Sequence, residues 1–204
     1  MDSKLNKKKI VLGKTEYGEV ILKGLYGNKK SSHKIAYIIG IHPQEFSAHN
    51  AIENTIKKKD KSLKYSYYIY KIKVTKEQDN YKKGRLYGQL LANEFAVPHI
   101  IQKKHNLTID VHSNQGEGEY SVKRFVFAPI EDKKSRLYAF KIIDKIPELV
   151  YYNPISQTST QYVTIPLINA GIPAIVYETY IYDTFEITKK NATIFVNTVD
   201  EILK

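Results

Sequence analysis

The stretch 35-IAYIIGIHPQE-45 gives the first indication of the fold, because an apolar run in it stops at residues that can bind a metal ion. Residues 35–41 are apolar at nearly every position, which is typical of a strand buried on both faces of a sheet. His42 follows this run directly, and Glu45 comes three residues later. The pair belongs either to an ordinary turn or to one half of a metal site, and the rest of the chain has to distinguish these interpretations.

Strand-like and helix-like segments alternate on both sides of this stretch. Short runs rich in Val, Ile and Tyr, bounded by turn residues, predict strands. These strands are expected at residues 10–12, 19–25, 35–41, 65–74, 107–111, 124–128 and 174–177. Segments with apolar residues on one helical face predict helices between them. These helices are expected at residues 47–59, 85–96, 133–146, 161–170 and 188–203.

This alternation predicts an α/β fold. Helices should cover both faces of a mixed, largely parallel sheet, which gives three layers, α/β/α. The chain has 204 residues, with no internal repeat, no low-complexity segment and no linker rich in Pro, Gly or Ser. Residues 1–204 are therefore expected to form a single domain with its own core.

The composition excludes several kinds of protein. The sequence contains no Cys, which rules out disulfides, thiolate metal ligands and a cysteine nucleophile. Any metal ion would have to be held by His and carboxylate side chains. No run of about 18 apolar residues is present, so no membrane-spanning helix is expected. The first residues lack the apolar core of a signal peptide, so a cytoplasmic location is expected.

The formal net charge is +11, and most of it comes from clustered lysines at residues 7–9, 29–30, 57–59 and 103–104. A basic balance of this size favours polyanions or an anionic substrate. The alternative is that Lys simply covers solvated faces and loop tips. No nucleic-acid-binding motif accompanies the lysines, so we expect no nucleic-acid partner.

Polar side chains follow three of the predicted strands, and functional residues in α/β folds gather beyond the carboxyl ends of strands. They are His42 and Glu45 after the first, His112 after the second and Glu178 after the third. Two imidazoles and one carboxylate form a catalytic zinc site that leaves a position open for water. The second carboxylate is then free to act as a base, which completes the groups needed for metal-assisted hydrolysis.

Each of these residues alone has an ordinary explanation. A His and a Glu three residues apart are a weak signal, His112 could be a satisfied histidine, and Glu178 could be an exposed carboxylate at a sheet edge. Their joint occurrence at strand ends is the stronger observation. The remaining histidines do not share this placement and are interpreted as surface or structural residues. They are His33, His49, His99 and His105.

Three short blocks resemble those of the M14-like zinc carboxypeptidases and their relatives, the succinylglutamate desuccinylase/aspartoacylase deacylases. The blocks are 40-GIHPQE-45, 110-DVHSN-114 and 170-AGIPAIVYET-179, and they occur in the family's order. The resemblance implies a zinc-carboxypeptidase-like fold with one Zn²⁺ per chain, held by His42, Glu45 and His112. It also implies that Glu178 is the general base that activates the metal-bound water and later protonates the leaving amine.

An arginine between the metal blocks of that family polarises the scissile carbonyl or holds a substrate carboxylate, and Arg85 is the candidate here. A planar guanidinium suits both roles, while the alternative is a solvated residue at a helix start. Many members carry an Asn-Arg pair that binds a terminal carboxylate, whereas this chain has Asn80 followed by Tyr81. The sequence therefore does not decide whether the protein recognises a terminal carboxylate, as a true carboxypeptidase does.

The residues expected to support the site or contact substrate are Asp110, Asn80, Asn114, Tyr162 and Tyr180. On an alternating strand Asp110 and His112 point to the same face. Asp110 is therefore predicted either to bond the ring nitrogen of His112 that does not bind metal, or to bond a neighbouring backbone group. A Tyr often assists in the peptidases, and the sequence does not choose between Tyr162 and Tyr180.

The leading hypothesis is a zinc-dependent hydrolase of an amide bond, acting on a peptide or a small molecule. It would be a small peptidase or carboxypeptidase, or an N-acyl amino-acid deacylase. One alternative is a non-catalytic module that binds polyanions on a decayed hydrolase scaffold, which should hold no zinc and depend steeply on salt. A further alternative is a metallohydrolase that uses the same ligands with another divalent ion.

Overall fold

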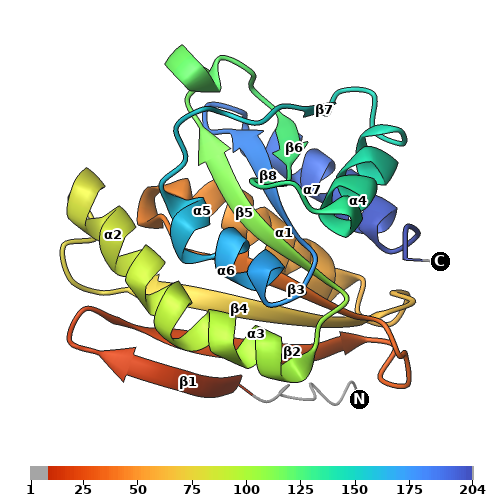
Figure 1. The fold of residues 1–204 in the computed structure, drawn as a ribbon, viewed down its shortest axis with the longest axis horizontal. Coiled ribbons are helices and arrows are strands. Elements are labelled where there is room, and N and C mark those ends of the chain that lie inside the picture. Colours follow the sequence, from red (N-terminus) through yellow and green to blue (C-terminus); the bar gives the residue numbers. More distant parts are fainter. Residues whose placement is uncertain (1–8, 204) are drawn as a thin grey trace.

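The computed structural model describes residues 9–203, and it contains an eight-stranded sheet in the order β1-β2-β4-β3-β5-β8-β6-β7 (Figure 1). Lys7 and Lys8 of the first lysine cluster lie outside the described residues. The strands are β1 (Lys9–Thr15), β2 (Gly18–Gly27), β3 (Lys34–Ile39), β4 (Ser66–Val74), β5 (Leu107–Asn114), β6 (Phe125–Phe127), β7 (Val150–Tyr151) and β8 (Ala174–Tyr180).

The centre of this sheet is parallel. Strand β3 pairs in parallel with β4 and β5, and β5 pairs in parallel with β8. Antiparallel pairing occurs toward the edges, where β2 pairs with β1 and β4, and β6 pairs with β8. The mixed, largely parallel sheet expected from the alternating segments is confirmed.

Seven α-helices cover the sheet within residues 9–203. They are α1 (Phe46–Lys58), α2 (Tyr81–Leu91), α3 (Val97–Lys103), α4 (Lys133–Ile143), α5 (Ser159–Tyr162), α6 (Thr164–Asn169) and α7 (Phe185–Val199). Apolar side chains of α1, α4 and α7 pack on one face of the sheet, and those of α2, α3 and α6 pack on the other. Two large apolar cores result, one on each face, which is the three-layer arrangement, and a smaller cluster of Phe125, Phe127 and Val176 lies at β6 and β8. No helix within residues 9–203 is long and apolar enough to cross a membrane.

Strand β3 shows why the opening stretch is apolar at consecutive positions. Ile35, Tyr37 and Ile39 belong to one core, and Ala36 and Ile38 belong to the other. The strand ends at Ile39, two residues earlier than predicted, because Gly40 has a φ of 87°. This conformation favours glycine, and a Cβ at residue 40 would lie 2.2 Å from the carbonyl oxygen of Ile72.

The predicted ends of the two strands that carry His112 and Glu178 were wrong. Strand β5 continues past residue 111 to Asn114, and β8 continues past residue 177 to Tyr180. The two strands pair in register through this extension, with His112 directly opposite Glu178. The paired ladder satisfies the backbone groups of both strands, so His112 and Glu178 lie within strands rather than after them.

The predicted helix at 85–96 was too short at both ends. Helix α2 begins at Tyr81, where the Asn80 side chain accepts a hydrogen bond from the backbone of Lys83. A π-helical turn, Ala92–Ala96, then leads into α3, and Pro98 sits in the first turn of that helix. Proline is tolerated there because its missing N–H is not required.

Smaller differences occur elsewhere. The predicted 161–170 helix is divided at residue 163 into α5 and α6. Helix α7 starts earlier than predicted, after the capping hydroxyl of Thr184, and α4 and α7 both end earlier. The two-residue strand β7 was not predicted, because so short a segment carries no periodic signal.

Candidate metal centre

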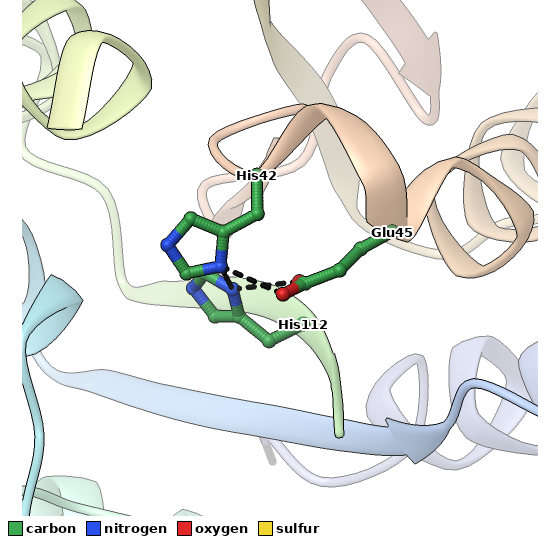
Figure 2. A group of neighbouring side chains, drawn as sticks. All are labelled: His42, Glu45 and His112. Atoms are coloured by element: carbon green, nitrogen blue, oxygen red, sulfur yellow. Dashed lines mark hydrogen bonds and ion pairs between the residues drawn. The ribbon is translucent and has the colours of Figure 1, made fainter. Parts of the chain in front are cut away.

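Three side chains from two segments meet at the carboxyl end of the parallel strands (Figure 2). His42 precedes the 3₁₀ turn η1 (Pro43–Glu45), whose hydrogen bond from the Glu45 amide to the His42 carbonyl measures 3.1 Å. This tight turn brings the Glu45 carboxylate back beside the His42 ring. His112 reaches the same point from β5, and all three residues are buried.

The distances within this group are short. Nδ1 of His42 lies 2.8 Å from Oε1 of Glu45, and Nδ1 of His112 lies 3.0 Å from Oε2. The two Nδ1 atoms are 3.0 Å apart. Three potential ligand atoms therefore face a common point, and they form the one such group found in residues 9–203.

The donor set fits a divalent metal ion. Imidazole nitrogens and a carboxylate are the ligands that zinc uses in catalytic sites, although other borderline ions accept the same set. Two unprotonated ring nitrogens facing each other at 3.0 Å would repel unless a cation or a proton lay between them. The predicted ligands His42, Glu45 and His112 thus come together, and their geometry is suited to one shared ion.

Several groups hold these ligands in place. Oδ1 of the fully buried Asp110 lies 3.0 Å from Nε2 of His112, which is an ion-pair distance, and no described group forms a well-aligned hydrogen bond with this carboxylate. The backbone N–H of Ser113 donates to Oε2 of Glu45 at 3.0 Å. Nη1 of Arg85 donates to Oε1 of the same carboxylate at 2.9 Å. Asp110 therefore faces the histidine ring, which is the first of its two predicted contacts.

The pKa values of the two histidines are shifted in opposite directions. Burial lowers the pKa of His42 to about 4. Burial would also lower the pKa of His112, but Asp110 and Glu45 outweigh it and raise that pKa well above its ordinary value. Burial opposes ionisation of Glu45, yet the two histidines hold its pKa well below the usual range. A metal ion that bound Nδ1 of His112 would have to displace a proton from that ring, so its binding would depend on pH.

Glu178 lies on β8 beside this centre. It is directly opposite His112 in the ladder, and its Oε2 lies 3.4 Å from Nδ2 of Asn114. Burial raises the pKa of the Glu178 carboxyl to about 8, and His112 partly opposes this shift. A carboxyl group with such a raised pKa holds and releases a proton near neutral pH, as a general acid or base requires.

A cavity of about 270 Å³ opens onto these groups. It is lined by His42, Gln44, Glu45, Tyr81, Arg85, Ser113, Asn114, Gln115, Glu117, Tyr120, Ser156, Thr158, Ser159, Glu178 and Ile181. Of the residues predicted to contact substrate, Arg85 and Asn114 lie at this cavity. Asn80, Tyr162 and Tyr180 are not in its lining.

The structure gives those three residues other contacts. The Asn80 side chain caps helix α2. The backbone carbonyl of Tyr162 accepts a hydrogen bond from Asn93, while the Tyr180 ring packs against Tyr182.

Two tyrosines that sequence reasoning missed, Tyr81 and Tyr120, line the cavity instead. The Tyr120 hydroxyl donates to the carbonyl oxygen of Ser156, and burial, followed by the nearby Glu178, raises its pKa. Tyr120 belongs to the short turn η3 (Gly118–Tyr120), and the glycines before it were the one signal of a loop in this region. Tyr81 places its ring under the guanidinium of Arg85, 5.0 Å from ring centre to Cζ.

The other histidines have structural contacts. Nε2 of His49 donates to the carbonyl of Val111, the residue before His112, at 3.0 Å. His99 bonds the hydroxyl of Tyr70, and His105 is buried against the Tyr68 and Tyr70 rings.

Comparison with known proteins finds similarity in structure and none in sequence. No protein family matches the chain, and no curated protein does. Among solved structures, a metallo-carboxypeptidase from Burkholderia cenocepacia superposes with a TM-score of 0.61 at 11% identity, covering 96% of this chain and 64% of its own. The chain has the metallo-carboxypeptidase fold.

Two further structures support this assignment of the fold. A protein from Shewanella denitrificans OS217, proposed to be a metallopeptidase, gives a TM-score of 0.58 at 12% identity, covering 96% of this chain and 83% of that one. A succinylglutamate desuccinylase/aspartoacylase from Rhodobacter sphaeroides gives 0.51 at 10% identity, covering 89% and 58%. The chain thus spans most of the Shewanella denitrificans protein, but less than two thirds of the carboxypeptidase and of the deacylase.

Proposed function

We propose that this protein is a zinc-dependent hydrolase of an amide bond, either a small peptidase or an N-acyl amino-acid deacylase. The observation that carries the proposal is the placement of a buried carboxyl with a raised pKa, Glu178, at the same cavity as His42, Glu45 and His112. The fold shared with metallo-carboxypeptidases and a deacylase is consistent with both substrate classes.

His42, Glu45 and His112 would hold the ion. A bound Zn²⁺ would act as a Lewis acid toward the scissile carbonyl and toward the attacking water. Glu178 would take the proton that this water loses and then deliver it to the nitrogen of the leaving amine. One carboxyl thus serves as base and then as acid, and no net proton remains on the protein after amine and acid are released.

The raised pKa of Glu178 is suited to this double role. A carboxyl near its ordinary value of 4.5 would be a poor acid toward an amine, whereas a pKa of about 8 keeps the transferred proton available. A nearby dication would favour the ionised form and bring the group into its basic state before reaction. Asn114 would orient the carboxylate through its contact with Oε2.

Arg85 would stabilise negative charge on the substrate. The sequence has three arginines, and the other two form ion pairs elsewhere, Arg124 with Asp183 and Arg136 with Glu131. Arg85 is therefore the arginine at this cavity, and it would bind either the developing oxyanion or a substrate carboxylate. Because Asn80 is occupied in capping α2, a second carboxylate-binding group of the kind found in true carboxypeptidases is not provided at that position.

The test is elemental analysis of the purified protein, paired with turnover of peptide and N-acyl amino-acid panels. We expect about one zinc per chain, loss of zinc in His112→Ala, and loss of turnover with retained zinc in Glu178→Gln. No divalent metal in the wild type, even after incubation with Zn²⁺, would refute the proposal. Steeply salt-dependent polyanion binding by such a protein would support the alternative of a binding module.

A further inference from the structure

Helix α2 lies directly against Ile41, in the segment that follows strand β3, and Gly88 makes this approach possible. A Cβ at residue 88 would lie 1.8 Å from the carbonyl oxygen of Ile41, far inside van der Waals contact. Because residue 88 has no side chain, the next residue, Gln89, is brought up to His42. Gln89 is 4% exposed, so its amide needs polar partners within the protein.

Those partners are on two sides of the site. Nε2 of Gln89 lies 3.3 Å from Nε2 of His42 and 3.4 Å from Oγ1 of Thr158. Thr158 lines the cavity beside the metal centre. One buried amide therefore touches both a candidate metal ligand and the wall of the cavity.

The orientation of the histidine rings explains what this amide does. His42 and His112 both turn Nδ1 toward Glu45. A neutral imidazole carries one N–H, so a ring that binds a cation through Nδ1 must carry its proton on Nε2. Nε2 of His112 faces the Asp110 carboxylate, and Nε2 of His42 faces the Gln89 amide.

A glutamine suits this position because its amide has a donor and an acceptor on one planar group. With its NH₂ toward His42, it donates to an unprotonated Nε2. After rotation of the amide by about 180°, its oxygen accepts the Nε2–H of a metal-binding ring and also the hydroxyl proton of Thr158. The same residue thus serves the metal-free and the metal-bound tautomer of His42.

We propose that Gln89 is a positioning residue for His42, which holds that ring with Nδ1 toward Glu45 in either tautomer and links it to Thr158 at the cavity. This inference rests on the proposed metal site. The two histidines then have unlike supports, a carboxylate for His112 and a neutral amide for His42. Only the carboxylate adds negative charge to the site, so Gln89 orients its ring without making that ring as electron-rich as His112.

The experiment compares Zn²⁺ affinity of the wild type, Gln89→Met and Gln89→Glu by competition with a chromophoric chelator. Gln89→Met keeps the volume but removes the acceptor, and should weaken Zn²⁺ binding about 10- to 100-fold. Gln89→Glu retains an acceptor and should recover most of the affinity. Gln115→Met, at an exposed position on the same cavity wall, is the matched control and should bind Zn²⁺ as the wild type does.

Two spectroscopic measurements separate positioning from general stability. Co²⁺ loaded into Gln89→Met should show an altered visible absorption spectrum, because a reoriented His42 changes the ligand field. In ¹⁵N NMR of the zinc-loaded wild type, His42 should be protonated at Nε2 with a slowly exchanging proton. This measurement needs no variant, so it tests the role of Gln89 even if Gln89→Met fails to fold.

Wild-type affinity and an unchanged Co²⁺ spectrum in Gln89→Met would overturn the role of Gln89 and leave the metal site standing. An Nε2 of His42 that is unprotonated, or that exchanges its proton as fast as an exposed histidine, would overturn that role as well. A wild type that binds no Zn²⁺ in the competition assay would overturn the proposed function, and this inference with it.

Discussion

Replacing Glu178 with Gln should stabilise the protein from which metal has been removed. In the zinc-loaded protein the same change should abolish turnover. The carboxyl is 6% exposed, and burial, reinforced by Glu45, raises its pKa from 4.5 to about 8. A group whose pKa is raised by folding contributes its full stability below the unfolded pKa and loses it as pH rises through the folded pKa. The wild type should therefore lose stability on account of Glu178 between about pH 4.5 and pH 8.

The size of this effect follows from the shift. One pKa unit corresponds to about 1.4 kcal/mol, so between about pH 5 and pH 8 the residue should lower the free energy of unfolding by about 3 kcal/mol. Gln has nearly the same shape and does not ionise. The stability difference between Glu178→Gln and the wild type should grow by that amount over this pH range.

The assay is urea unfolding of both proteins in the presence of a chelator, at about pH 5 and pH 8. Glu117→Gln is the matched control, because Glu117 lines the same cavity but is exposed, and it should leave the stability difference unchanged with pH. A Glu178→Gln difference that is independent of pH would refute the reasoning. It would mean that the carboxylate is already ionised in the folded metal-free protein.

The remaining predictions concern the metal, the substrate and the fold. His112→Ala should abolish bound zinc, measured by elemental analysis; equal zinc in mutant and wild type would contradict the ligand assignment. Arg85→Ala should lower kcat/KM about 100-fold with zinc retained, whereas loss of zinc would assign Arg85 to holding Glu45. Glu53→Gln should destabilise the fold by about 3 kcal/mol at neutral pH, because the buried Glu53 pairs with Lys23, Lys57 and Lys71 and has a pKa lowered to about 2. Burial alone would raise the pKa of Glu53, but the three lysines outweigh it. Urea unfolding should therefore show that the stability contributed by Glu53 is lost as the pH falls from about 4.5 toward 2. Equal stability of Glu53→Gln and the wild type at neutral pH would disprove this prediction.

Much of the fold was readable from local patterns. Consecutive apolar residues at 35–41 identified a strand buried on both faces, and the structure divides those side chains between two cores. The alternation of segments predicted the layers, because a sheet with helical crossovers has few other solutions. The candidate ligands could be proposed because parallel strands have their carboxyl ends at the same edge of the sheet, where functional residues gather.

The features that could not be predicted from the sequence depend on contacts between distant segments of the chain. The extension of β5 and β8 arises from their mutual pairing, so neither strand end could be predicted from its own residues. Tyr120 lies in the short turn η3 and Tyr81 is the first residue of α2, and both line the cavity, while Tyr162 and Tyr180 do not.

The same holds for the supporting contacts of the centre. A single glutamine gives no periodic or motif signal in a sequence. Gln89 lies beside His42 because Gly88 lets helix α2 approach Ile41, and this contact is decided by the tertiary structure. The sequence by itself determined which atoms are able to bind a metal ion, because that is a property of residue type. Tertiary packing decided which nitrogen of each ring faces the site and which carboxyl is deprived of water, because both depend on neighbours brought from elsewhere in the chain.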